Sequence, residues 1–466
     1  MTSVRRRRVF AAAATGAALA LVLTACGGND DPEPGATGDG DGGDADCAAY
    51  EQYGDLSGKT VTVYTSIVSP EDQPHIDSYK PFEECTGATI SYEGSKEFEA
   101  QLLVRLEAGS APDIAYIPQP GLLQTIVQDY PDTIVPASEG TSANVDEFFS
   151  PSWKTYGSVD GTFYAAPLGA NVKSFVWYSP KQFEANGYDI PETWDDLIAL
   201  SDKIVADHGA DGAKPWCAGI GSGDATGWPA TDWLEDMVLR TAGGDVYDKW
   251  ITNDVKFNDP QIATALEKVG EILRNPDYVN GGLGDVSSIA ATTFQDGGLP
   301  ILAEDGKDPL CYMHRQASFY AANWPAGTNV AEDGDVFAFY FPGLDAGTRP
   351  VLGGGEFVAA FSDRPEVAAF QAFLASPEWA NAKAVSTPNG GWVSANSGLD
   401  PKNLVSPIDQ LSATILGDTT QEFRFDASDL MPAAVGAGSF WTQMTAWIAE
   451  GKSDADVLDA IQASWP

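Results

Sequence analysis

Histidine and cysteine are scarce in this chain. It contains three histidines and five cysteines among 466 residues. His75, His208 and His314 are far apart in the sequence, and no two cysteines form a Cys-x-x-Cys pair. A structural zinc site takes four such ligands, usually grouped at short spacings. We therefore expect no metal site and no cofactor.

The sequence motifs of common enzyme classes are also missing. The chain has no Gly-x-Ser-x-Gly elbow, no Walker loop and no His-Glu-x-x-His. Gly219–Gly223 is glycine-rich like a nucleotide-binding loop, but its spacing fits neither template. Some pair among the 67 acidic residues could imitate a glycosidase site, yet nothing in the sequence singles one out. We therefore expect a protein that is not an enzyme.

The long hydrophobic run of this chain lies at the N-terminus. Residues 9–23 are apolar except for Thr15 and Gly16, follow four arginines, and end in Leu-Thr-Ala-Cys at 23–26. This order is typical of a secretory signal peptide, and the run is too short and too rich in alanine for a permanent membrane span. The last four residues resemble the lipobox of bacterial lipoproteins, which implies cleavage before Cys26 and diacylation of its thiol. The simpler interpretation is an ordinary secretory signal that contains a cysteine.

Two acyl chains are enough for stable anchoring. We therefore expect residues 1–25 to be a signal peptide and Cys26 to hold the protein at the outer face of the cell membrane. The arginines also fit a twin-arginine signal, and the sequence does not separate this export route from the general one. Residues 26–46 have no apolar periodicity and are rich in Gly and Asp, so we expect a flexible acidic tether.

Basic residues are few. Lys and Arg total 26 against 67 Asp and Glu, a formal charge of −41, and loss of the four arginines at positions 5–8 with the signal peptide leaves about −45. Nucleic acid and anionic lipid headgroups repel such a chain. We expect no nucleic-acid partner.

Four cysteines remain if Cys26 carries lipid, and disulfides persist outside the cytoplasm. Four cysteines permit three pairings. Proximity along the sequence favours the pairs Cys47–Cys85 and Cys217–Cys311.

Strand-like and helix-like segments alternate from residue 59 onwards. Residues 59–64, 89–92 and 112–117 have strand patterns, and residues 72–85 and 96–108 have helical ones. The alternation predicts a parallel sheet with helices on both faces, and ligands bind beyond the carboxyl ends of strands in such sheets. Three polar residues follow these strands: Ser66, Ser95 and Gln119.

Two groups of motifs resemble the extracellular solute-binding proteins of ABC importers. The first is APDI at 111–114 followed by PQPG at 118–121, and the second is KSFVWY at 173–178 followed by PETWDDL at 191–197. The similarity runs from Cys47 to the C-terminus, and it is to the branch for sugars and alpha-glucosides, related in fold to maltose-binding protein. Each motif alone is weak, and their order along the chain makes the resemblance.

The resemblance implies an α/β, two-lobe, periplasmic-binding-protein-like (type II) fold, in which crossing strands act as a hinge and the lobes enclose a central cleft. We place the first crossing at 171–178 and the return at 351–357. The expected boundaries are 47–170 and 351–415 for lobe I, and 171–350 and 416–466 for lobe II. Further helices are predicted at 194–208, 260–273, 365–374, 438–448 and 455–465.

A sugar has an apolar ring face and a rim of hydroxyl groups. Aromatic rings can stack on the face, while carboxylates, amides, Lys and Arg bind the rim. Thirteen tryptophans exceed average use. By resemblance, Trp441 lies where the maltose-binding branch stacks a tryptophan on sugar, and residues 228–233 also supply aromatics there. The aromatic candidates are Trp228, Trp233, Trp392 and Trp441, and a place in the hydrophobic core is the alternative for each.

The polar candidates are Gln119, Lys173, Asp232, Gln316 and Glu356. Gln119 matches a ligand-contacting position of the family, but it is an amide where maltose-binding protein has a charged pair, so the sugar is not carried over. Each of these residues could also have a role other than binding a ligand. Lys173 could simply be solvated, Asp232 could cap a helix, and Gln316 could have a structural role. Gly355 could offer its backbone N–H to a ligand or belong to a hinge turn.

We therefore predict a lipid-anchored binding protein that captures a mono- or oligosaccharide, such as an alpha-glucoside, by lobe closure and delivers it to an ABC permease. Its expected partners are the sugar, the permease and the membrane, and it is expected to be a monomer. The alternatives are a surface-anchored glycoside-active enzyme with carboxylates about 5–10 Å apart, an adhesin without an open cleft, and a binding protein for a non-sugar solute.

Overall fold

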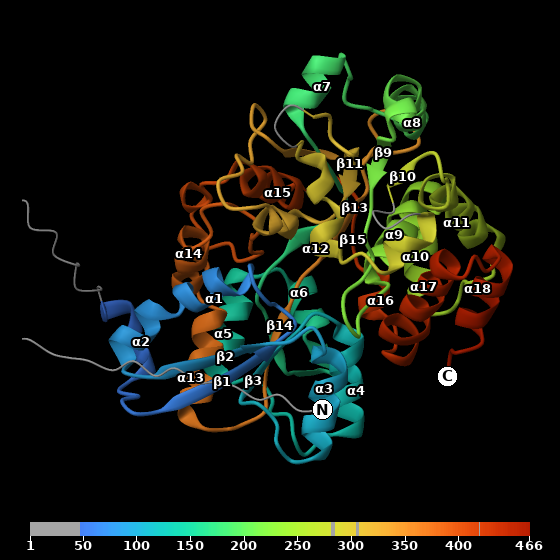
Figure 1. Ribbon diagram of the computed structural model, residues 1–466. Coiled ribbons are helices and arrows are strands. Elements are labelled where there is room, and N and C mark those ends of the chain that lie inside the picture. The colour runs from blue at the N-terminus through green and yellow to red at the C-terminus, as the bar shows by residue number, and fades with distance from the viewer. Residues whose placement is uncertain (1–46, 281–284, 304–306, 419) are drawn as a thin grey trace, which may run out of the picture. The chain divides into compact units, whose positions relative to one another are not determined.

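The structure is a computed structural model that describes residues 47–280, 285–303, 307–418 and 420–466. The predicted signal peptide, the lipobox with Cys26 and the tether lie outside these residues. The described chain has the predicted two-lobe α/β fold (Figure 1). Within the described ranges, no helix combines the length and the apolar character needed to cross a bilayer.

The first sheet contains, in spatial order, β2 (Thr89–Gly94), β1 (Thr60–Thr65), β3 (Ile114–Ile117), β14 (Phe357–Ala360) and β6 (Ala165–Pro167). β1, β2 and β3 are parallel, whereas β14 is antiparallel to β3 and β6. All four residues of β3 are buried, which is the pattern of a strand covered on both faces. The predicted parallel arrangement of the three N-terminal strands is confirmed.

The helices that accompany this sheet are α1 (Asp72–Ser78), α2 (Lys80–Thr86), α3 (Phe98–Glu107), α4 (Pro120–Asp129), α5 (Glu139–Phe148), α6 (Pro151–Tyr156), α13 (Pro365–Leu374) and α14 (Pro377–Val385). A short hairpin is formed by β4 (Ser158–Val159) and β5 (Thr162–Phe163). The single helix predicted at 72–85 is wrong, because the chain breaks at Tyr79 into α1 and α2. Pro81 lacks an N–H, and its ring would clash with the carbonyl of Asp77 in a continuous helix. A disulfide joins Cys47 to Cys85 at the end of α2.

The second sheet contains, in spatial order, β10 (Val279–Asn280), β9 (Lys214–Cys217), β11 (Cys311–Arg315), β8 (Phe175–Tyr178) and β12 (Phe337–Tyr340). Its helices are α7 (Pro180–Asn186), α8 (Trp194–His208), α9 (Trp228–Ala242), α10 (Gly244–Ile251), α11 (Pro260–Leu273) and α12 (Phe294–Gly297). α8 has the predicted bounds, since Thr193 and Asp196 form a capping box at its start. The second disulfide, Cys217–Cys311, joins β9 to β11. Both disulfides are the pairs that the sequence favours.

A third, three-stranded sheet is built from the segments that pass between the two larger ones. Its strands are β15 (Phe423–Phe425), β13 (Val351–Gly354) and β7 (Asn171–Val172). β7 lies between β6 of the first sheet and β8 of the second in the sequence, and β13 lies between β12 and β14. Figure 1 shows β13 and β15 between the strands of the larger sheets. The two predicted crossings are therefore present, and β15 adds a third that the sequence analysis did not identify.

The C-terminal part contains α15 (Pro407–Gly417), α16 (Ala427–Leu430), α17 (Trp441–Ala449) and α18 (Asp454–Gln462). Most of the helix predicted at 438–448 is present as α17, and its first three residues belong to a π-helical segment, Ala434–Phe440, that continues into α17. Trp447 of α17 and Leu458 of α18 are buried in the same core cluster as Trp216 of the second sheet. The last two helices thus pack on the second lobe.

Candidate functional site

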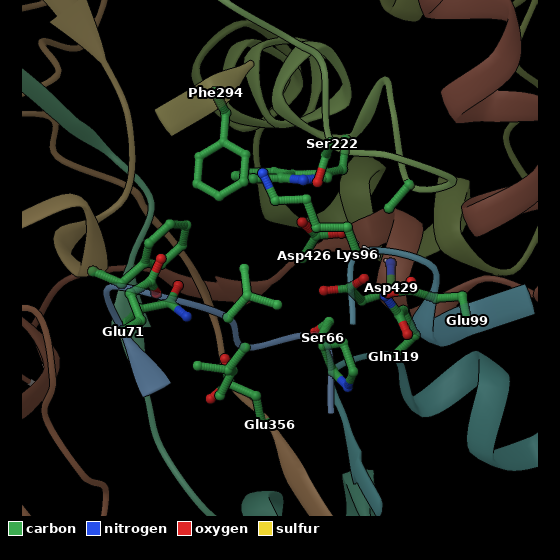
Figure 2. Close-up of a pocket in the computed structure, with 18 of the residues that line it drawn as sticks. Ser66, Glu71, Lys96, Glu99, Gln119, Ser222, Phe294, Glu356, Asp426 and Asp429 are labelled. Atoms are coloured by element: carbon green, nitrogen blue, oxygen red, sulfur yellow. Dashed lines mark hydrogen bonds between the residues drawn. The ribbon is translucent and has the colours of Figure 1, made fainter. Parts of the chain in front are cut away.

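A cavity lies where the carboxyl ends of the first-sheet strands face residues of the second lobe. Its empty space, including the part open to solvent, is about 910 Å³. The first sheet and its loops contribute Ser66, Ile67, Val68, Glu71, Lys96, Glu99, Pro118, Gln119, Gly355 and Glu356. The crossing segment contributes Asn171 and Lys173, and the remaining wall comes from Ser222, Ala225, Trp228, Phe294, Gln295, Phe319, Asp426, Asp429 and Trp441. Figure 2 shows Phe294 and Ser222 along one side and Glu71, Ser66 and Glu356 along the other.

Gln119 and Glu99 form a polar corner of the cavity. Gln119 precedes Pro120 at the start of α4 and is 4% exposed. Its Nε2 donates to Glu99 Oε1 at 3.2 Å. Gln119 Oε1 and Glu99 Oε2 are buried without a hydrogen-bond partner in the protein. Because an unsatisfied buried polar atom costs about 1–3 kcal/mol, this corner favours a ligand with polar groups.

Three aromatic side chains form an apolar wall opposite. Trp228 is the first residue of α9, and its ring lies 5.0 Å from that of Phe294 and 5.9 Å from that of Phe319. All three are partly exposed, unlike the buried aromatics of the core. Aromatic surface combined with a few placed polar groups is typical of a small-molecule site.

Trp441 starts α17 and also lines the cavity, although it is only 3% exposed. Its Nε1 donates to Ser428 Oγ at 3.3 Å. This bond holds the indole in place and leaves its ring as the part available to a ligand.

Lys173 is the central charge of the cavity. Its Nζ lies 3.0 Å from Asp232 Oδ1 and also donates to Asp426 Oδ2. The same ammonium lies 5.5 Å from the centre of the Trp228 ring. Asp426 follows β15, Asp232 is on α9, and Lys173 follows β7. One ion-pair cluster therefore joins two crossing strands to the second lobe.

A second layer of charges lies behind this cluster. Arg315 Nη2 donates to Asp236 Oδ2 at 2.8 Å and to the Asp232 carbonyl at 2.8 Å. Ser174 Oγ donates to Asp236 Oδ1 at 2.8 Å and accepts from the Leu352 N–H of β13 at 2.9 Å. Both crossing segments, β7–β8 and β13, are thereby fastened to α9.

The pKa values of the cluster follow from burial and from pairing. Burial opposes the charge on Lys173, but Asp232 and Asp426 together hold its pKa well above the usual value. Burial raises the pKa of Asp232 to about 7. Asp426 is buried as well, yet its contact with Lys173 lowers its pKa to about 2. Lys173 and Asp426 are therefore the ionised pair at neutral pH.

Burial also acts on the other carboxyl groups of the cavity. It raises the pKa of Glu71 to about 7 and raises the pKa of Glu99 and Glu356. A protonated carboxyl group donates one hydrogen bond and still accepts others. Near neutral pH Glu71 can therefore serve both the oxygen and the hydrogen of a ligand hydroxyl.

Asp232, Glu235 and Asp426 have carboxylate oxygens within 4.8 Å of one another. The Lys173 ammonium contacts two of these three residues. Both oxygens of Glu235 accept backbone N–H groups, from Ala427 at 2.9 Å and Ser428 at 3.2 Å. Five of the six carboxylate oxygens bind protein groups, whereas Asp232 Oδ2 is buried without a hydrogen-bond partner. The cluster is therefore mainly an ion-pair network.

The cavity brings together seven of the residues expected to contact a ligand: Ser66, Gln119, Lys173, Trp228, Gly355, Glu356 and Trp441. Gly355 is required by packing, since a Cβ there would collide with the Gly169 carbonyl and lie 3.2 Å from Trp153. Asp232 contacts Lys173 but does not itself line the cavity.

Four other expected contacts lie elsewhere. Trp233 is packed in the core, 5.3 Å from the Trp216 ring, because five residues along α9 turn it away from the Trp228 side. Gln316 is 1% exposed, and its Oε1 accepts the Ala317 N–H. Ser95 Oγ accepts the Glu97 N–H before α3. Trp392 lines an adjoining cavity.

Several cavity residues were not predicted from sequence. Lys96 and Glu99 lie just beyond Ser95, so the rule that ligands bind at carboxyl ends of strands could have included them. Phe294 and Phe319 lie in a four-residue helix and a 3₁₀ turn, which have no periodic signal. Asp426 follows the crossing strand that was missed.

Comparison with known proteins gives concordant results. The family model for bacterial extracellular solute-binding proteins matches residues 67–381. The alpha-glucosides-binding periplasmic protein of Rhizobium meliloti (strain 1021) is 38% identical over 428 residues, 88% of each chain. An osmoprotective compounds-binding protein of Synechocystis is 37% identical over 416 residues, 89% of this chain and 94% of that protein.

Solved structures share the fold at low identity. A bacterial solute receptor with an exclusive preference for β-D-galactopyranose superposes with a TM-score of 0.71 at 17% identity, covering 87% of this chain and 98% of that one. A maltose-bound protein of T. maritima superposes with a TM-score of 0.65 at 17% identity, with the same coverage.

Proposed function

The chain belongs to the sugar-binding branch of the bacterial extracellular solute-binding proteins of ABC transporters, and from this we propose that it captures a sugar, such as an alpha-glucoside, in the cavity between its lobes. The observation that supports the proposal is that an apolar surface and a polar surface face each other across the cavity. Trp228, Phe294 and Phe319 offer an apolar wall, and Gln119 and Glu99 face the same cavity with unpartnered polar atoms. A sugar presents both kinds of surface in one ring.

Capture proceeds by closure of the lobes, a shift toward the form that binds the ligand more tightly. Contacts across the cavity support this mechanism. Lys96 Nζ donates to Gln295 Oε1 at 2.9 Å, and Asn323 Nδ2 donates to Glu71 Oε1 at 3.0 Å. Each joins a first-sheet loop to a segment of the second lobe, so each forms only when the lobes meet.

We also propose where the protein acts and which partner it serves. The protein acts outside the cytoplasm as a monomer, held by a lipid on Cys26, and delivers its ligand to a membrane permease without changing it chemically. The hinge is the three-stranded sheet, with lobe I at 47–170 and 351–415 and lobe II at 171–350 and 416–466. The lipobox sequence supports the anchor, and membership in the family supports the permease partner.

A cationic osmolyte is the second candidate ligand. Five carboxyl groups and two lysines line the cavity, and aromatic faces attract quaternary ammonium groups. One relative is named for osmoprotective compounds.

Isothermal titration of residues 47–466 against a panel tests both candidates. The panel contains glucose, galactose, maltose, trehalose, sucrose and raffinose beside glycine betaine and a tripeptide. We expect at least one sugar to bind and the betaine and tripeptide not to bind. Binding of betaine with no response to any sugar would replace the sugar proposal while leaving the family unchanged.

A further inference from the structure

The glycine-rich segment Gly219–Gly223, which fits no nucleotide-binding template, lies beside the main cavity. It is part of the loop that connects β9 to α9 in the second lobe. Ser222 of this segment lines the cavity, whereas Gly223 does not. Glycine permits backbone approaches that a side chain would block, and each of the three glycines of the segment makes such an approach.

The first two glycines fasten the segment to its own lobe. A Cβ on Gly219 would lie 2.4 Å from the Thr293 carbonyl oxygen, and a Cβ on Gly221 would lie 3.0 Å from that of Thr292. The Gly221 N–H donates to the Thr292 carbonyl at 2.8 Å, and the Gly221 carbonyl accepts the Phe294 N–H at 2.9 Å. The segment therefore belongs to the second lobe and moves with it.

Thr226 fixes the turn that contains Gly223. Its Oγ1 donates to the Gly223 carbonyl at 2.6 Å and accepts the Ser222 N–H at 3.0 Å. Its own N–H donates to the same Gly223 carbonyl at 3.2 Å. Gly223 has a φ of +60°, in the left-handed region. The turn therefore presents Gly223 in one defined orientation.

Gly223 meets the first lobe at Lys96. A Cβ on Gly223 would lie 2.5 Å from the Lys96 carbonyl oxygen, whereas a carbon–oxygen contact is ordinarily at least about 3.3 Å long. The Lys96 backbone is fixed next to Ser95, whose N–H donates to the Thr65 carbonyl at 2.9 Å and whose Oγ accepts the Glu97 N–H at 3.1 Å. Since no side-chain rotation relieves such an overlap, a Cβ at position 223 would hold the lobes roughly 1 Å further apart here.

The side chain of Lys96 also contacts the second lobe. Its Nζ donates to Gln295 Oε1 at 2.9 Å, next to Phe294 of the aromatic wall. Lys96 therefore contacts the second lobe twice, with its backbone at Gly223 and with its side chain at Gln295. Glu99 of the polar corner is three residues further along the chain, so the approach of the lobes at Lys96 determines the distance between the polar corner and the aromatic wall.

We propose that Gly223 is a positioning residue for ligand capture. Because it has no side chain, the second lobe closes fully onto the first at Lys96, and this contact sets the separation of the two cavity walls. The inference rests on the proposed function, since it assumes capture by lobe closure. It means that the affinity for a ligand held between the lobes depends on a residue that does not line the cavity.

Isothermal titration with maltose and trehalose tests this role in the wild type and in Gly223→Ala, Gly223→Asn, Gly187→Ala and Gly187→Asn. Gly187 ends α7 with a φ of +63°, and an added Cβ there would meet no atom within 4 Å. Its variants therefore carry the same backbone strain without the contact between the lobes. Asn tolerates the left-handed region better than Ala, so the Asn variants separate the effect of the Cβ from that of the strain.

We expect both Gly223 variants to bind the sugars about 5- to 100-fold more weakly than the wild type, because overpacking opposes the closed form. Small-angle X-ray scattering at saturating sugar should give them a larger radius of gyration. The Gly187 variants should change affinity less than twofold, although thermal unfolding should show a similar fall in Tm in both sets. Equal affinities in the Gly223 and Gly187 variants would overturn the inference but not the proposed function.

A disulfide assay tests the contact without any sugar. In Lys96→Cys combined with Gly223→Cys, the Cβ at position 223 would lie 3.0 Å from that of position 96, and a small opening brings the pair to the roughly 3.5–4.5 Å of a disulfide. We expect mild oxidation to link the two positions, seen as a shift in non-reducing electrophoresis that neither single variant shows. Failure to form the link would overturn the inference. Binding of no sugar by the wild type would refute the proposed function, while this assay would still decide whether the contact forms.

Discussion

Replacement of Lys173 by Met tests the charged centre of the site. The change keeps an unbranched side chain of similar length but removes the ammonium that contacts Asp232 and Asp426. Both carboxyl groups are buried, with 0% and 1% of their side chains exposed. Breaking a buried ion pair by removing one partner typically costs about 3–5 kcal/mol. We expect a loss of that size in the free energy of unfolding at pH 7.5.

The loss should depend on pH, and the direction follows from Asp426. In the wild type, Lys173 lowers the pKa of this carboxyl to about 2, below its unfolded value of about 3.9. Without Lys173, burial raises the pKa above the unfolded value, so the folded variant binds a proton that the unfolded chain releases. Stability then falls as pH rises from about 4 to the new folded pKa, by about 1.4 kcal/mol per pH unit. The deficit relative to the wild type should be smaller at pH 5.5 than at pH 7.5.

Urea unfolding of both proteins at the two pH values measures the deficit. Lys181→Met is the matched control, because the Lys181–Asp335 pair is at the surface, with side chains 61% and 38% exposed. Such pairs contribute about 0–1 kcal/mol. A deficit below about 1 kcal/mol for Lys173→Met, or one that is equal at pH 5.5 and 7.5, would show that this lysine does not hold the buried carboxylates.

Three further predictions concern the cavity wall, the lobe contact and the second lobe. Trp228→Ala should weaken sugar binding at least about tenfold, measured by titration calorimetry, with little change in Tm. Trp233→Ala removes a core side chain and should lower the free energy of unfolding by about 3–5 kcal/mol. The opposite result would show that Trp233 contacts the sugar and that Trp228 belongs to the core. Burial raises the pKa of Glu71 from 4.5 to about 7, so the closed form binds a proton that an open, solvated carboxyl releases between these pH values. Sugar affinity should therefore fall as pH rises from about 5 to 7 and level off above pH 7. Glu71→Gln should flatten this dependence, and an equal slope in both proteins would contradict the assignment. The disulfide Cys217–Cys311 spans 94 residues, so replacing both cysteines with Ala should lower the free energy of unfolding by about 2–5 kcal/mol. Urea unfolding measures this loss, and an unchanged midpoint would contradict a stabilising role for the disulfide.

Elements with strong local signals could be predicted from the sequence. α8 and α11 have the predicted bounds, because Thr193 and Asp259 accept backbone N–H groups at their starts. The single helix predicted at 72–85 misses the break at Tyr79, because the prediction does not weigh the effect of Pro81 on a continuous helix. β15 has only three residues, and its position is set by pairing with β13, which is 72 residues distant at Val351↔Phe423. No local pattern contains that information.

The site could be predicted only in part for a similar reason. Residues within two positions of a strand end, such as Ser66 and Gln119, reach the cavity because parallel strands end at one edge of the sheet. The same rule could not tell which tryptophans of a helix face the cavity and which face the core. Trp228 and Trp233 belong to the same α9, and only the packing of Trp233 against Trp216 shows which one faces the core.

A crystal structure of the protein with the sugar that binds most tightly in the panel tests the central claim most directly. We predict a sugar ring in the main cavity, with its face against Trp228 or Trp441 and its hydroxyls bonded to Gln119, Lys173 or Glu356. A sugar bound outside this cavity, or a ring that touches none of these side chains, would contradict the account.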